Sequence, residues 1–142
     1  MSRTFKQLLV LTGLFALTAC QDTNFPEGMA GTYVATEFTI TIGNVVDVLA
    51  AGGSLEITLN HNGTTTGSLL IPVSVLEPGE TNPSGDFTAD LAGTWRFVGD
   101  SLFFIQEADT FVRDQAWEGD GNGFWLRFTK GTTEIFVYLS RQ

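Results

Sequence analysis

Hydrophobic and polar residues alternate along much of the chain after residue 30, in short runs separated by turn-forming residues. In residues 31–42, Val34, Phe38 and Ile40 fall in one set of alternate positions, whereas Tyr33 falls in the other. A period of two residues is that of a β-strand, in which successive side chains point to opposite faces. This run therefore predicts a strand with Phe38 and Ile40 on one face and Tyr33 on the other.

Three segments between the runs indicate turns of different kinds. Asn62-Gly63 lies between two alternating runs and predicts a hairpin, because both residues tolerate positive φ. Residues 44–51 break the alternation and are followed by Gly52-Gly53, which predicts a short helical or 3₁₀ turn over 44–51. Residues 76–86 contain two prolines and two glycines, and we expect the longest loop there.

Short alternating or apolar runs with turn signals between them predict roughly nine strands in all. After residues 31–42 they are expected near 55–59, 64–73, 87–91, 94–98, 102–107, 110–117, 124–129 and 133–139. Several late runs are apolar on both faces, which suits a barrel or a sandwich better than an open sheet with one wet face. The predicted fold is all-β, a small closed antiparallel meander barrel of about 8–9 strands. A sandwich remains the alternative.

The N-terminus has the three parts of a secretory signal. Arg3 and Lys6 give a positive start, an uncharged and mostly apolar run covers residues 8–19, and the chain becomes polar directly after Cys20. A transmembrane helix needs ~20 apolar residues, so the run is too short to span a bilayer. We therefore expect a signal helix over residues 1–19.

The junction Leu17-Thr18-Ala19-Cys20 resembles the lipobox of bacterial lipoproteins. The resemblance implies cleavage before Cys20, a diacylglycerol on its thiol and an acyl group such as palmitate on its new amine. Gln21, rather than an aspartate, follows the cysteine, which in this family favours the outer membrane. The expected organisation is a signal peptide at 1–19, a tether at 20–28 and one domain at 29–142, extracytoplasmic and anchored in the outer membrane facing the periplasm.

Composition limits the partners of the domain. The net charge of −9 argues against nucleic acid, whose phosphates the protein would repel, and against an electrostatic hold on anionic lipid. Cys20 is the sole cysteine, so no disulfide can form within one chain. Membrane contact is therefore expected through the lipid anchor alone.

A short sequence motif occurs twice in the chain and provides a second resemblance. Ala30-Gly31-Thr32-Tyr33 recurs as Ala92-Gly93-Thr94-Trp95, each at the start of a predicted strand. The Gly-x-aromatic of the first strand is similar to the Gly-x-Trp signature of lipocalins and of lipocalin-like domains in bacterial lipoproteins. That resemblance implies that Tyr33, in place of the tryptophan, packs across a closed barrel end near Arg141 of the last strand.

The sequence contains no recognisable catalytic or metal-binding set. His61, the sole histidine, lies in the predicted Asn62-Gly63 hairpin, and no Gly-x-Ser-x-Gly presents a nucleophile. Zinc cannot be held by one histidine and a lipidated cysteine. The run Asp120-Gly121-Asn122-Gly123 lacks the closing glutamate of a calcium loop and predicts a hairpin turn. We expect no enzyme activity, metal or cofactor.

Candidate ligand residues are aromatic side chains and one arginine. The aromatics would either line an apolar cavity or fill the core, since an eight-stranded barrel is just wide enough for side chains. Arg113, between Asp109 and Asp114, would either bind a ligand carboxylate or form a structural ion pair. Two functions follow: binding of a small apolar ligand, or a non-enzymatic structural or protein-interaction role. The aromatic candidates are Trp95, Phe97, Phe103, Trp117, Phe124 and Phe128.

Overall fold

The computed structural model describes residues 28–77 and 85–142. The predicted signal helix, Cys20 and the tether up to residue 27 lie outside the described residues. Within the described part of the chain, no helix is long and apolar enough to cross a membrane.

The domain is a closed barrel of eight antiparallel strands, with two additional strands and one short helix, which confirms the predicted fold class. The elements are β1 (Gly31–Ile42), β2 (Asn44–Asp47), β3 (Ser54–Leu59), β4 (Thr64–Ile71), α1 (Val73–Leu76), β5 (Phe87–Asp90), β6 (Gly93–Val98), β7 (Ser101–Gln106), β8 (Trp117–Gly119), β9 (Gly123–Lys130) and β10 (Thr133–Arg141).

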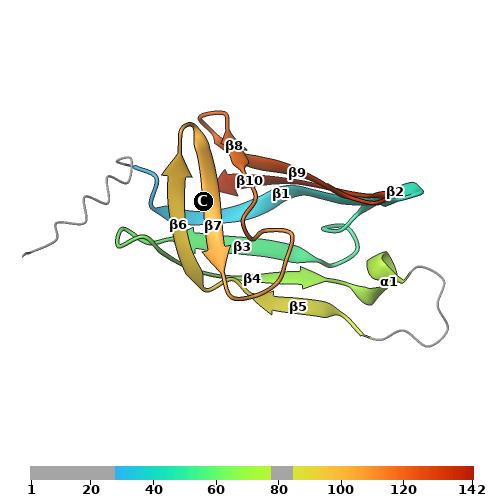
Figure 1. Cartoon of the computed structure of the whole chain (residues 1–142). Helices are drawn as coiled ribbons and strands as arrows, with labels where there is room; N and C mark the ends of the chain where they lie inside the picture. Colours follow the sequence, from blue (N-terminus) through green and yellow to red (C-terminus); the bar gives the residue numbers. More distant parts are fainter. Residues whose placement is uncertain (1–27, 78–84) are drawn as a thin grey trace, which may run out of the picture.

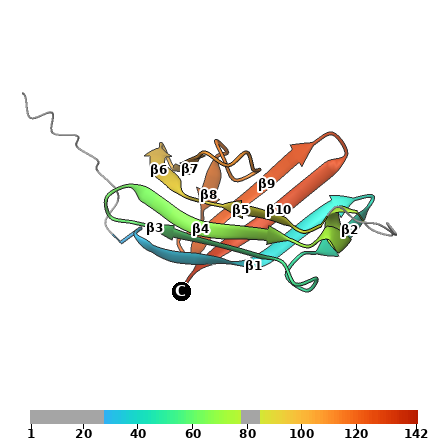
Figure 2. The same cartoon turned by 90° about the horizontal axis from the view of Figure 1, so that it is seen from below.

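The barrel follows the order β1-β3-β4-β6-β7-β8-β9-β10 and closes through pairing of β10 with β1. β2 pairs with the second half of β1, and β5 with the second half of β4. In Figure 1 the start of β1 lies on the same side as the β6–β7 and β8–β9 turns, while α1 and the β1–β2 turn lie at the opposite end. Figure 2 shows β9 and β10 running diagonally to β3 and β4.

A β-bulge in β1 changes the faces that simple alternation predicts. The β1–β10 register shifts between Ala35 and Glu37, where one extra residue enters β1. As a result Tyr33 (4% exposed) and Phe38 (1% exposed) both point into the barrel, although a strict period of two places them on opposite faces.

The segment after β1 is only partly the helical turn that the sequence predicts. Residues 44–47 form β2, and a tight turn follows in which the Ala51 N–H donates to the Asp47 carbonyl at 3.1 Å, as in one helical turn. The short helix α1 was not expected. It begins after Pro72, which ends β4 because proline has no N–H to continue a ladder.

Residues 110–117 do not form the predicted strand. β8 contains only Trp117 of this run, and the preceding residues form a loop. The Val112 N–H donates to Thr110 Oγ1 at 3.2 Å, and the Arg113 N–H donates to the Thr110 carbonyl at 3.2 Å. These local bonds replace ladder bonds, as threonine side chains commonly do at turns. The prediction was therefore wrong for all but the last residue of this run.

This loop helps to fill the barrel. Val112 is fully buried, and the Phe111 ring lies 5.7 Å from that of Phe38 in β1. Trp117 packs edge to face on Phe104, with ring centroids 5.6 Å apart. We call the buried side chains Val48, Val75, Phe104, Val112 and Trp117 the filled interior.

Candidate functional site: a pocket where the chain enters the barrel

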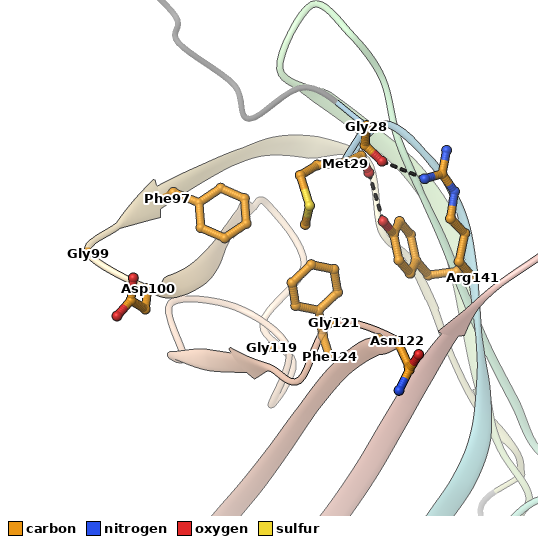
Figure 3. Close-up of a pocket in the computed structure, with 12 residues that line it drawn as sticks. Gly28, Met29, Phe97, Gly99, Asp100, Gly119, Gly121, Asn122, Phe124 and Arg141 are labelled. Atoms are coloured by element: carbon orange, nitrogen blue, oxygen red, sulfur yellow. Dashed lines mark hydrogen bonds between the residues drawn. The ribbon is translucent and has the colours of Figure 1, made fainter.

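A pocket of about 420 Å³ opens at the end of the barrel where β1 begins (Figure 3). One wall is Gly28 and Met29, which belong to the segment Gly28–Ala30 leading into β1; we call it the lead-in segment. The opposite wall consists of the β6–β7 turn and the β8–β9 turn. The site therefore lies directly beside the point at which the predicted tether joins the domain.

The floor of the pocket is apolar. Tyr33 and Phe124 are buried, and their ring centroids lie 5.3 Å apart. Phe97 is half-buried and lies 6.3 Å from Phe124, with Trp95 packed behind it at 6.0 Å. Met29 adds a flexible thioether side chain that adapts readily to different apolar surfaces. The accessible parts of these side chains form an apolar, aromatic surface.

Tyr33 and Arg141 hold the lead-in segment in place. They are direct partners in the β1–β10 ladder. The Tyr33 hydroxyl donates to the Met29 carbonyl at 2.9 Å, and Arg141 donates to the carbonyls of Gly28 and Ala30, the latter at 2.8 Å. Three consecutive carbonyls are thus bound from the two barrel strands. Burial raises the pKa of Tyr33, and the nearby charge of Arg141 offsets part of this rise.

The β8–β9 turn owes its shape to Asp120. Its Oδ1 accepts the N–H groups of Asn122 at 2.9 Å and Gly123 at 3.1 Å, and the Tyr138 hydroxyl of β10 donates to both carboxylate oxygens. These bonds, chiefly the one from the Asn122 N–H, lower the pKa of Asp120, and the carboxylate in turn raises the pKa of Tyr138. β10 therefore supports both walls of the pocket.

Two glycines give this wall its form. A Cβ on Gly123 would lie 2.0 Å from the Leu139 carbonyl oxygen, so only glycine permits β9 and β10 to approach here. Gly121 has φ +89°, a conformation that residues with a Cβ rarely adopt, and open space lies beside it. The wall is consequently backbone with little side-chain cover.

The aromatic side chains singled out in the sequence fall into two groups. Phe97 and Phe124 line the pocket, whereas Trp95 and Trp117 belong to the buried core. Phe103 and Phe128 are half-buried and do not line the pocket.

The other three candidate residues, Arg113, Tyr33 and Arg141, lie in two different places. Arg113 contacts Asp109 at 2.7 Å and Asp114 at 3.7 Å, the ion-pair arrangement that sequence reasoning weighed against a ligand role. Tyr33 and Arg141 do lie together, but beside an open pocket rather than at the closed end that the lipocalin resemblance implies.

Sequence reasoning missed Met29, Asp100 and Asn122 as pocket residues. The sequence predicts a turn at 120–123, and Gly99-Asp100 lies between the strands expected near 94–98 and 102–107. The signal that was available is the number of glycines in these turns, since two glycine-rich turns at one barrel end leave space uncovered by side chains.

The charges around the pocket are sparse. Asp100 and Arg141 are its charged lining residues. Among residues 28–77 and 85–142, no cluster of three histidine, cysteine or acidic side chains is arranged to hold a metal ion.

Comparison of the chain with protein-family models, curated proteins and solved structures gives no match.

Proposed function

We propose that the chain is a lipid-anchored lipoprotein of the cell envelope whose barrel binds a small apolar ligand in the pocket at its tether end. The observation that carries the proposal is the pocket itself. Its volume of about 420 Å³ falls within the range of roughly 300–1,000 Å³ typical of small-molecule sites, and its apolar lining residues are Met29, Tyr33, Phe97 and Phe124. A few polar groups on an apolar surface are the usual composition of such a site.

The proposed role is non-catalytic. The pocket offers Asp100 and Arg141 as its charged side chains, and Arg141 already binds the lead-in segment. His61 lies in the β3–β4 turn and does not line the pocket. This lining suits binding of an apolar molecule rather than acid–base or nucleophilic chemistry.

Native mass spectrometry of the full chain purified from its own host tests the binding proposal. Gly119→Leu is the informative variant, because a Cβ there meets the Phe124 ring at 3.4 Å and a leucine would occupy the pocket. Glu118→Leu is the matched control, since the neighbouring side chain is exposed on β8. We expect a bound small molecule in the wild type and in Glu118→Leu but not in Gly119→Leu. Repeated isolation of an empty wild-type protein would refute the proposal.

Metabolic labelling with palmitate tests the proposed anchor. The lipobox resemblance implies that wild type incorporates label and that Cys20→Ala does not. Equal incorporation in both would show that the acyl groups are not attached through Cys20. The matched control is Gln21→Ala, because this substitution leaves Cys20 and the residues before it intact.

A protein-interaction role is the second candidate, and one observation favours it. Val45 in β2 is 68% exposed, at the end of the barrel opposite to the pocket, and Ile42, 45% exposed, lies in the adjacent pair of the β1–β2 ladder, on the other face. Val45 thus offers a partner protein an exposed apolar side chain on a strand that, among the described residues, pairs with β1 alone. If the wild-type protein is repeatedly empty and Val45→Asp reduces crosslinking to envelope proteins, this role replaces ligand binding.

A further inference from the structure

The charges at the pocket rim indicate which kind of apolar ligand would fit, an inference that rests on the proposed function. We propose that the pocket takes a single-chain amphiphile, with its chain on Met29, Phe97 and Phe124 and its anionic head group at Arg141.

Within the part of the chain that the structure describes, the hydrogen-bond partners of Arg141 are backbone carbonyls rather than carboxylates. Arg113 and Arg127 each have a carboxylate oxygen at 2.7 Å, from Asp109 and Glu134 respectively. Within residues 28–77 and 85–142, Arg141 has no carboxylate at ion-pair distance, although the chain carries 16 acidic residues against 7 basic ones. The carbonyls of Gly28 and Ala30 fix the position of the guanidinium but carry no negative charge to offset its positive charge.

The guanidinium retains donors for a ligand. An arginine side chain has five N–H groups, and two of its nitrogens bind the Gly28 and Ala30 carbonyls. Arg141 is exposed at the rim, so an anion can approach without burial of an unpaired charge. Planar bidentate donors suit carboxylate and phosphate oxygens in particular.

The opposite side of the pocket has the opposite charge. Figure 3 shows Asp100 and Arg141 on opposite sides, with Phe97, Met29 and Phe124 between them. An anionic head group would be repelled near Asp100 and attracted near Arg141, so one orientation of an amphiphile is favoured. The volume of about 420 Å³ lies at the small end of the range for ligand pockets, which suits one chain rather than several.

Photoaffinity labelling in nanodiscs tests this proposal on the full chain. The protein is reconstituted in phosphatidylcholine nanodiscs containing a long-chain fatty acid or the matching fatty alcohol, each with the same diazirine in its chain. A third sample contains lysophosphatidylglycerol, which has a single acyl chain, with the same diazirine in that chain. The readout is the amount of label on peptides that contain Met29, Phe97 or Phe124, and the ratio of acid to alcohol label within each variant.

We expect the acid to label these peptides about threefold more than the alcohol, as an exposed ion pair permits. In Arg141→Gln the ratio should fall to about one, while Arg141→Lys should retain most of the preference. Arg96→Gln is the matched control, because Arg96 is exposed on β6 and does not line the pocket. A loosened lead-in segment would change acid and alcohol labelling alike, so the ratio isolates the charge.

The outcomes separate the two proposals. Equal acid and alcohol labelling in the wild type, or an unchanged ratio in Arg141→Gln, would overturn the role of Arg141 but leave ligand binding standing. No labelling of the pocket peptides by any probe would overturn both. Strong labelling by the lysophosphatidylglycerol probe would support the proposal and identify a single-chain membrane lipid as the source, whereas labelling by the acid alone would support it with a free fatty acid.

Discussion

The two parts of the barrel interior are built differently from similar residues. In the filled interior, Trp117 packs on Phe104, and the 107–116 loop inserts Val112. At the pocket end, Phe97 and Phe124 meet glycine-rich turns that carry few side chains, and about 420 Å³ stays open. Aromatic residues therefore do not by themselves indicate a cavity, because what faces them across the barrel decides whether space remains.

The largest expected difference in unfolding free energy is between truncation of an aromatic side chain in the filled interior and truncation of one at the pocket end. Trp117 is fully buried, so Trp117→Ala should cost about 3–5 kcal/mol of unfolding free energy. Phe97 already faces open space, so Phe97→Ala should cost roughly half as much. Urea denaturation of both variants measures the difference. Equal losses would mean that the pocket end is packed as tightly as the filled interior.

The inserted loop gives the second contrast. Val112→Ala removes two fully buried methyl groups and should cost about 2 kcal/mol, whereas Val45→Ala, at a residue 68% exposed, should change stability by less than about 0.5 kcal/mol. Thermal unfolding of the two variants is the measurement. A negligible effect of Val112→Ala would show that the loop does not fill the barrel.

A smaller loss of unfolding free energy is expected when a hydrogen bond to the lead-in segment is removed. Tyr33→Phe removes the 2.9 Å bond to the Met29 carbonyl and should cost about 1 kcal/mol. Tyr138→Phe is the control, because its hydroxyl bonds an exposed carboxylate and the effect should be smaller. Hydrogen exchange should also become faster in the first residues of β1 in Tyr33→Phe. Exchange at unchanged rates would indicate that Arg141 alone holds this wall.

The smallest expected effect depends on pH. The pKa of Asp120 is lowered in the folded state, so its stabilisation is fully present above its usual pKa near 3.8 and is lost as the pH falls through the lower folded value. The stability difference between wild type and Asp120→Asn should therefore shrink below about pH 4. Unfolding midpoints measured between acidic and neutral pH test this. A difference that stays constant would exclude the carboxylate as the cause.

The sequence predicted the strands well because most of them bury one face, which leaves a period of two. It missed the bulge at Ala35 and Glu37, since an extra residue in one strand leaves no mark in the periodicity. It also assigned residues 110–117 to a strand, where Thr110 side-chain bonding favours a loop.

The pocket was predicted only in part, for a different reason. Phe97 and Phe124 were recognised as candidates because aromatic residues are visible in a sequence. The space beside them depends on where the β6–β7 and β8–β9 turns meet the lead-in segment, and this depends on contacts such as Arg141 with Ala30 across 111 residues. Pairings of that range are not contained in local patterns.

Methyl NMR of the methionines tests the central claim most directly. The chain contains 2 methionines, Met1 and Met29, and Met29 lines the pocket. With ¹³C-methyl labelling, titration with a long-chain fatty alcohol should shift the Met29 signal saturably in wild type and in Glu118→Leu. The shift should be absent in Gly119→Leu, where the new side chain occupies the pocket. An unmoved Met29 signal in wild type, or the same saturable shift in Gly119→Leu, would contradict ligand binding at this end of the barrel.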